Sequence, residues 1–177
     1  RLKPINMGFY AKGGPACGWQ SANYFAMMCA DEGMIGLSMS TADISVTAPG
    51  AVGRVIGNNP FAYAVPSGSE PMNLDIATAI VAGGKVHAAV REGRDVPLGW
   101  ITDKDGNPTT DPTLALKGSI TPIGDHKGFG LTFVIEILAG LLAGSPYFGI
   151  QRDDVAKHVS EKGIGHFFFL WQQQSHQ

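Results

Sequence analysis

The chain has 177 residues, of which 44% are hydrophobic and 16% charged, so it is long and apolar enough for one ordinary domain with a buried core. Its formal net charge of -2 gives no electrostatic basis for binding nucleic acid. Intrinsic disorder, which requires low hydrophobicity and high net charge, is not indicated either. We therefore predict a single domain over residues 1–177.

Hydrophobic spacing and turn residues predict the elements in chain order. They are a helix over 21–32, strands over 34–40, 61–65 and 72–76, a helix over 79–91, a strand over 100–103, a short helix over 111–118, a helix over 131–142 and a strand over 165–170. Residues 41–60 are expected to form a loop, because they carry repeated turn signals. Gly33 is expected just beyond the end of the first helix.

Alternating strands and helices predict the α/β class, as a mixed sheet with helices packed on it and the strand order left open. The helix over 131–142 is apolar nearly all round, which predicts that it is buried. Glu136 interrupts this helix, and a carboxylate there must find a polar partner. Lys127 lies about two and a half turns back and could pair with it only if the preceding loop folded over. More commonly, a carboxylate in such a helix faces another polar group or lies at a subunit interface.

Cysteine usage and apolar segments predict a cytoplasmic protein. Cys17 and Cys29 are too few for a disulfide framework, and we expect two small buried thiols. The first ten residues contain no apolar run like that of a signal peptide. The longest apolar run, 131–143, is shorter than the roughly 20 residues that a membrane-spanning helix needs. Neither a membrane nor nucleic acid is an expected partner.

A glycine-rich segment directly before the buried helix is the first candidate site. Residues 124–130 read Gly-Asp-His-Lys-Gly-Phe-Gly. Glycine-rich backbone that enters a helix presents amide groups without partners, and the helix dipole favours an anion there. Lys127 adds a positive charge, so the segment suits a phosphate, a pyrophosphate or a carboxylate. A tight packing loop with Lys127 in solvent explains the pattern equally well.

The second candidate is the end of a strand, Asp75-Ile76-Ala77-Thr78, before the helix over 79–91. Ligands of open α/β sheets often lie beyond the carboxyl ends of strands, and Asp75 could accept a hydrogen bond from a ribose hydroxyl. The commoner role of such an aspartate is to cap the following helix.

Histidine is the natural acid or base for hydride chemistry near neutral pH. His126 has the most suggestive position, because it lies in the glycine-rich segment. We expect His87 on a helix, His158 in a polar stretch, His166 as a structural residue of a strand and His176 in the tail. No cluster has the spacing of metal ligands, so no metal site is predicted.

Several short motifs, in this order and spacing, resemble the type 2 malate/L-lactate dehydrogenases, a family that includes ureidoglycolate, sulfolactate and diketogulonate dehydrogenases. The resemblance covers roughly residues 21–169. The motifs are Gly33–Met39, Gly57–Pro60, Leu74–Thr78, Gly84–Val86, Val96–Trp100, Asp105–Pro112, Gly124–Gly130 and Gly165–Phe168. The resemblance implies an α/β fold other than the Rossmann fold, in agreement with the missing Gly-x-Gly-x-x-Gly fingerprint. It also implies oxidation of a small 2-hydroxyacid, or reduction of the 2-keto acid, with NAD or NADP, in a homo-oligomer such as a homodimer.

The resemblance further implies a set of cofactor-binding residues. They are Asp75, Ile76, Ala77 and Lys127, with Thr78 and His126 beside them and Ser40 and Ala42 after the first strand. Related enzymes often carry serine or asparagine around the position of Ala42.

The ends of the chain depart from the family pattern. The Ser-His-Gly stretch that carries the family's acid/base histidine is missing, and Gly18 stands where a second family histidine is expected. The catalytic residues therefore stay unassigned, and we expect residues 1–177 to be the cofactor-binding core of a longer enzyme. A catalytically incomplete nucleotide- or anion-binding fragment and a purely structural subunit are the alternatives. The substrate's carboxylate should face an arginine, and four stay unranked: Arg54, Arg91, Arg94 and Arg152.

Overall fold

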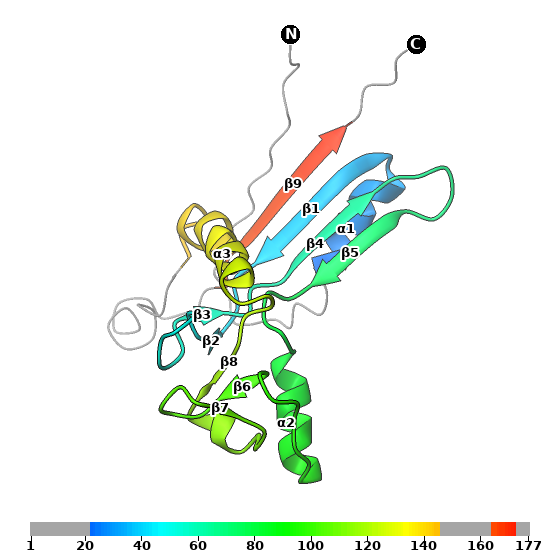
Figure 1. Cartoon of the computed structure of the whole chain (residues 1–177). Helices are drawn as coiled ribbons and strands as arrows, with labels where there is room; N and C mark the ends of the chain where they lie inside the picture. The colour runs from blue at the N-terminus through cyan, green and yellow to red at the C-terminus, as the bar shows by residue number, and fades with distance from the viewer. Residues whose placement is uncertain (1–21, 146–163, 173–177) are drawn as a thin grey trace, which may run out of the picture.

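The computed structural model describes residues 22–145 and 164–172 and contains two sheets, not the one mixed sheet expected (Figure 1). The four-stranded sheet has the order β5-β4-β1-β9, and all its pairs are antiparallel. The prediction is confirmed for three strands, and the last strand extends two residues beyond its predicted end. The strands are β1 (Met34–Ser40), β4 (Phe61–Val65), β5 (Met72–Ile76) and β9 (His166–Gln172).

The second sheet consists of short strands in the order β3-β2-β8-β6-β7. They are β2 (Ile44–Val46), β3 (Ile56–Gly57), β6 (Ile101–Thr102), β7 (Pro108–Thr109) and β8 (Ser119–Ile120). β2 and β8 pair in parallel and the other pairs are antiparallel. The expected loop over 41–60 therefore contains β2 and β3, and β7 and β8 were not expected. Strands of two or three residues are too short to show the alternation on which strand prediction depends.

Two predicted helices are shorter in the structure. The helix predicted from residue 79 begins at Gly83, as α2 (Gly83–Glu92), because Ala79 bridges to Pro122 and the Ile80 amide donates to the Thr121 carbonyl. The helix predicted over 111–118 is a single 3-10 turn, η1 (Leu114–Leu116). α2, β6 and β8 share the apolar core of the second sheet, which includes Val46, Ile56, Val86, Ala89, Ile101 and Ile120.

The predicted apolar helix begins five residues early, as α3 (His126–Ile135), and continues as a π-helical segment, η2 (Glu136–Leu141). Gly128 and Gly130 are thus helical, although glycine has low helix propensity. Gly128 is required by packing, since a Cβ atom there would lie 1.9 Å from the Ile123 carbonyl oxygen. The glycine-rich segment is therefore mostly the first turns of the helix.

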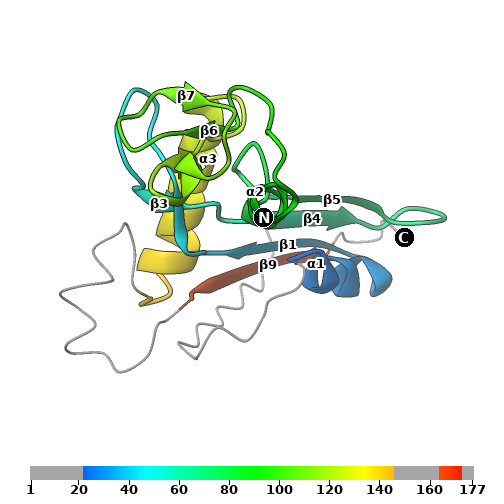
Figure 2. The same ribbon diagram turned by 90° about the horizontal axis from the view of Figure 1, so that it is seen from below.

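α1 (Ala22–Asp31) covers one face of the four-stranded sheet, and α3 lies on the other face (Figure 2). Small side chains allow the close approach of α1: Ala22, Ala26 and Ala30 pack on Ala62 and Ala64 of β4. A Cβ atom at Gly36 of β1 would lie 2.5 Å from the Ala26 carbonyl oxygen. Gly33 has a φ of +73° between α1 and β1, which confirms the glycine predicted at the end of this helix.

The sheet face opposite α1 is apolar across all four strands. By register it carries Ile35, Leu37, Met39, Phe61, Tyr63, Val65, Met72, Leu74, Ile76, Phe167, Phe169 and Trp171. Met39 and Phe167 are buried against Ile135 and Ala139 of the α3–η2 helix, whereas Met72 and Trp171, farther along the sheet, are exposed.

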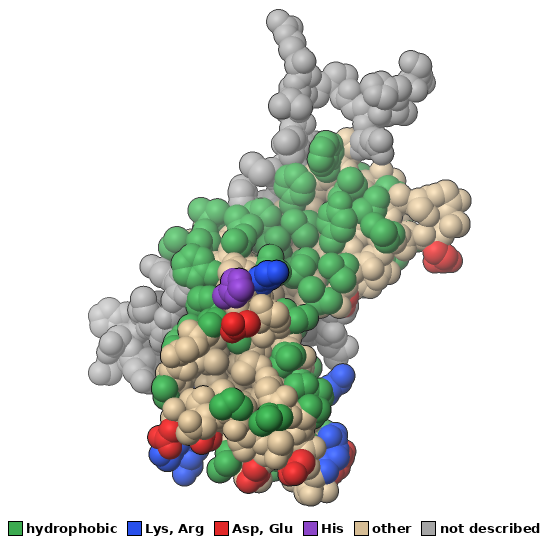
Figure 3. Space-filling view, viewed as in Figure 1, with side chains coloured by type: hydrophobic (Ala, Val, Ile, Leu, Met, Phe, Trp, Pro, Cys, Tyr) green, Lys and Arg blue, Asp and Glu red, His purple; other side chains and the backbone are tan. Residues whose placement is uncertain are grey.

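The prediction that the apolar helix is buried all round is wrong for the described part of the chain. Leu131, Phe133, Val134, Leu141 and Leu142 are 43–60% exposed. Together with the open sheet face they form the broad hydrophobic surface in Figure 3. An apolar sequence pattern predicts that a helix surface is shielded from water. It does not predict whether the same chain or another molecule shields it.

The described residues contain no helix long and apolar enough to cross a membrane. Within the same residues, no group of three or more His, Cys, Asp and Glu side chains could hold a metal ion. Cys29 is a partly buried free thiol, and burial raises its pKa. Cys17, Gly18, Arg152, His158 and His176 lie outside the described residues.

Candidate functional site

The predicted cofactor segments leave the four-stranded sheet at the same end. β1 and β5 both pair antiparallel with β4, so these two strands run in the same direction. Ser40 ends β1 and Ile76 ends β5, and the chain continues from them into Thr41-Ala42 and Ala77-Thr78. The sheet thus brings together two of the three segments that the sequence singled out.

Register places neighbouring predicted residues on opposite faces of the sheet. Asp75 pairs with Ala62 and lies on the α1 face, where its side chain is exposed, whereas Ile76 pairs with Phe61 on the face that carries α3. Asp75 does not cap the following helix, because α2 begins only at Gly83. Ser40 is buried, and its hydroxyl donates to the Thr41 carbonyl.

Thr78 links the end of β5 to the segment that enters α3. Its amide donates to the Asn58 carbonyl at 3.0 Å, and its carbonyl accepts a hydrogen bond from the Ile123 amide at 2.9 Å. Its side chain is 0% exposed, and the hydroxyl donates to the hydroxyl of Thr132 at 2.6 Å. The backbone that follows Asp75-Ile76 is therefore a direct neighbour of the glycine-rich segment.

The start of α3 presents three exposed ionisable side chains, Asp125, His126 and Lys127. His126 and Lys127 are both exposed, and the capping residue Asp125 has a φ of +55°, unusual for a residue other than glycine. His126 Nδ1 lies 3.9 Å from Asp125 Oδ2. No ion pair between Lys127 and another described residue is found. Figure 3 shows a histidine beside a cationic side chain where α3 begins, within the apolar surface.

Asn59, which lies in the expected loop and in one of the family motifs, joins the end of β1 to the α3–η2 helix. Its side chain is 0% exposed. Oδ1 accepts a hydrogen bond from the Ala42 amide at 2.9 Å, and Nδ2 donates to the Thr132 carbonyl at 3.2 Å and to the carboxylate of Glu136. Glu136 is 3% exposed, and the Asn59 side-chain amide is a polar partner of its buried carboxyl group. Two features of the sequence could have indicated this contact: a carboxyl group within an apolar helix and an Asn-Asn-Pro turn.

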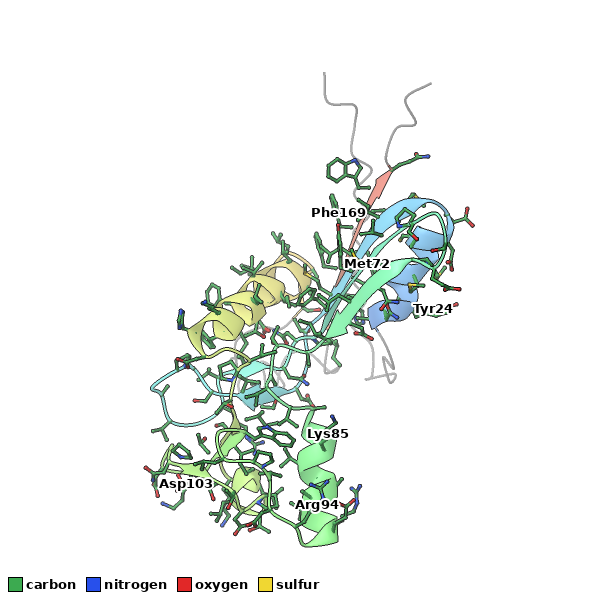
Figure 4. All side chains as sticks on the ribbon, turned by 45° about the vertical axis from the view of Figure 1, so that its right-hand side comes forward. Tyr24, Met72, Lys85, Arg94, Asp103 and Phe169 are labelled. Carbon is green, nitrogen blue, oxygen red and sulfur yellow. The ribbon has the colours of Figure 1, made fainter. Side chains whose placement is uncertain are left out.

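The described arginines differ in what they already bind. Arg54 donates from Nε to the Gly118 carbonyl and from its terminal nitrogen to the carbonyls of Ala115 and Leu116, so it closes the end of η1. Arg94 pairs with Glu92 on α2. Figure 4 shows Lys85 on α2 and Arg94 just beyond the end of α2, away from Met72 and Phe169. Arg54 is thus engaged in structure, which disfavours it as the carboxylate partner of a substrate.

His87 lies on α2, as predicted, and is exposed. His166 opens β9, as predicted, and burial lowers its pKa, which favours the neutral imidazole.

The sequence model of one protein family, described as malate/L-lactate dehydrogenase, matches residues 16–176. This chain belongs to the malate/L-lactate dehydrogenase family. The resemblance carried by the sequence motifs is therefore confirmed, as is the α/β class that it implies.

Members of the malate/L-lactate dehydrogenase family share both sequence and fold with this chain. The malate dehydrogenase of Pyrococcus horikoshii is 38% identical over 159 residues, 84% of this chain and 43% of that protein. The (2R)-3-sulfolactate dehydrogenase (NADP(+)) of Chromohalobacter salexigens is 37% identical over 144 residues, 80% of this chain and 43% of that protein. The solved structure of a dehydrogenase from Sinorhizobium meliloti has a TM-score of 0.77 at 37% identity, covering 85% of this chain and 44% of that one. The chain thus spans less than half the length of these relatives.

Proposed function

We propose that this chain forms the NAD- or NADP-binding core of an oxidoreductase that transfers a hydride between the nicotinamide and a small 2-hydroxyacid or 2-keto acid. One observation carries the proposal: hydrogen bonds join residues 40–42, residues 75–78 and α3 at one end of the four-stranded sheet. These are the segments that the family resemblance assigns to the cofactor. The relatives named as malate and sulfolactate dehydrogenases support the reaction class.

The start of α3 is the proposed contact for the cofactor phosphates. The amino end of a helix attracts anions, and the exposed ammonium of Lys127 adds a full charge there. Gly128 keeps the helix close to Ile123, next to Thr78. We also propose that the site differs from the Rossmann type. An antiparallel sheet and the lack of a Gly-x-Gly-x-x-Gly sequence support this part of the proposal.

The residues of this chain would bind and orient the cofactor, while the nicotinamide would supply the hydride chemistry. Asp75, at the open edge of β5, is a candidate acceptor for a ribose hydroxyl. His126 is exposed beside Lys127 and can contribute to the same contact. The acid or base that moves the substrate proton stays unassigned.

The proposal includes a homo-oligomer in the cytoplasm. The exposed apolar side chains of α3, η2 and the open sheet face support self-association, because contiguous apolar patches of this kind mark interaction surfaces.

A fluorescence titration of the purified protein with NADH and with NADPH tests the function, followed by oxidation assays with oxaloacetate, pyruvate and 3-sulfopyruvate. Saturable binding of a dinucleotide and its oxidation by one of these acids are expected. Binding without oxidation would favour the catalytically incomplete nucleotide-binding fragment. Failure to bind either dinucleotide would overturn the proposal.

A further inference from the structure

A chain of buried hydroxyl groups fastens α3 to the rest of the candidate site. The Thr78 hydroxyl donates to the Thr132 hydroxyl at 2.6 Å, and the Thr132 hydroxyl donates to the Gly57 carbonyl at 3.2 Å. Thr78 and Thr132 are both 0% exposed. The Thr78 hydroxyl also lies 3.5 Å from the Asn59 carbonyl oxygen. When its single proton points to Thr132, the closer partner, the Thr132 hydroxyl accepts that hydrogen bond and donates its own proton to Gly57.

Asn59 continues this network from Thr132 to the end of β1. Its side chain bonds both α3 and the Ala42 amide. Gly57 makes that fold possible, because a Cβ atom there would lie 2.4 Å from the Ala42 carbonyl oxygen and from Asn59 Oδ1. A side chain at this position would therefore push apart the segments that Asn59 joins.

The network lies close to the proposed phosphate contact without being part of it. Thr132 is five residues after Lys127, or about one and a half helical turns. Its hydroxyl is buried, so it cannot touch a cofactor at the exposed start of α3. The hydrogen bonds of Thr132 therefore fix the distance between the start of α3 and residues 75–78.

We propose that Thr132, Thr78 and Asn59 are positioning residues, which set the spacing of the three cofactor segments and thereby the affinity for the dinucleotide. This inference rests on the proposed function. Thr78, grouped with the cofactor contacts by the family resemblance, acts in this account through Thr132. Buried polar networks that are fully hydrogen-bonded fix a single arrangement, because any other arrangement leaves a polar group without a partner.

Thr132→Val tests the inference, since valine keeps the shape of threonine and removes the hydroxyl. The control is Ile101→Val, a core change in the second sheet at a residue that makes none of the hydrogen bonds of the network. Dinucleotide Kd and thermal midpoint are measured for each variant, with whichever of NADH and NADPH the wild type binds. We expect Thr132→Val to raise the Kd about tenfold, by analogy with the roughly 10–100-fold losses that follow removal of groups supporting metal ligands. Thr132→Ser should return the Kd to near the wild-type value, and in turnover the cofactor KM should rise more than kcat falls.

Equal Kd values for Thr132→Val and Ile101→Val would overturn the positioning role while leaving the proposed function intact. A wild-type protein that binds neither dinucleotide would overturn both. If Thr132→Val does not fold, Thr78→Val removes the donor of the same hydrogen bond and is judged by the same criterion.

Discussion

The side-chain amide of Asn59 donates a hydrogen bond to the carboxylate of Glu136, and both side chains are buried. This contact joins a turn before β4 to the middle of the α3–η2 helix, across 77 positions of sequence. It explains how a carboxyl group is retained in an apolar helix, because a buried polar group needs a hydrogen-bond partner.

Two substitutions of Glu136 distinguish the contribution of its side-chain shape to stability from that of its hydrogen-bond acceptor oxygen. Glu136→Leu leaves the Asn59 amide without that acceptor and should lower the free energy of unfolding by about 1–3 kcal/mol. Glu136→Gln keeps an acceptor oxygen and should lose less. Urea denaturation of the two variants measures the difference, and equal losses would show that the hydrogen bond contributes nothing.

Gly128→Ala should move the start of α3, because the new Cβ would lie 1.9 Å from the Ile123 carbonyl oxygen. Overpacking of this kind costs about 1–3 kcal/mol. Gly130→Ala is the matched control, as nothing lies within 4 Å of its Cβ position. We expect a lower thermal midpoint and weaker dinucleotide binding for Gly128→Ala alone. Similar behaviour of the two variants would contradict the close packing.

Lys127→Ala should weaken NADH or NADPH binding by roughly tenfold or more, since a hydrogen bond to a charged group contributes about 1.5–3 kcal/mol. Lys127→Arg should retain much of the affinity. Lys85→Ala, an exposed lysine on α2, is the control and should bind as the wild type does. A salt titration adds a check, because loss of a phosphate contact should reduce the dependence of Kd on ionic strength. Unchanged dinucleotide binding by Lys127→Ala would contradict the proposed contact between Lys127 and the cofactor phosphates.

Acid should loosen the β6–β7 hairpin and the turn before η1. The backbone N–H of Asn107, followed by that of Asp105, holds the pKa of Asp103 below its usual value, and the hydroxyl and N–H of Thr113 lower the pKa of Asp111. A carboxyl whose folded pKa is lowered stabilises the fold above the unfolded pKa, about 3.9, and loses this effect as pH falls through the folded value.

The thermal midpoint of the wild type should therefore fall below about pH 4 partly through these two groups. Asp103→Asn should show a smaller fall over that range, and Asp31→Asn, an exposed residue at the end of α1, serves as the control. Identical pH profiles for Asp103→Asn and the wild type would contradict the role of Asp103.

The apolar surface predicts self-association. Val134→Lys places a charge on the exposed face of α3 and should reduce the mass measured by light scattering toward that of one chain. Leu114→Lys, an exposed apolar residue of η1 outside this surface, should leave the mass unchanged. A wild-type protein that is already monomeric would contradict the homo-oligomer.

The longer strands could be predicted because each carries enough residues to show its pattern. β1 and β4 follow from mostly apolar runs and β5 from alternating apolar and polar residues, and the predicted bounds of all three match the structure. β6 falls within the predicted strand over 100–103, but the two-residue strands β3, β7 and β8 were not predicted, because they depend on hydrogen bonds to backbone far away in the sequence. The start of α3 was misplaced because Gly128 and Gly130 oppose a helix locally, whereas packing against Ile123 requires a residue without a Cβ atom.

The sequence by itself determined the family, the α/β class and the segments that carry the candidate site, since motif order and apolar periodicity are properties of the linear chain. Only the tertiary structure decided that Asp75 and Ile76 face opposite sides of the sheet, and that Asn59 joins Ala42, Thr132 and Glu136. The physical reason is that burial and hydrogen bonding act between segments far apart in sequence. A buried polar group takes whichever partner the fold brings to it.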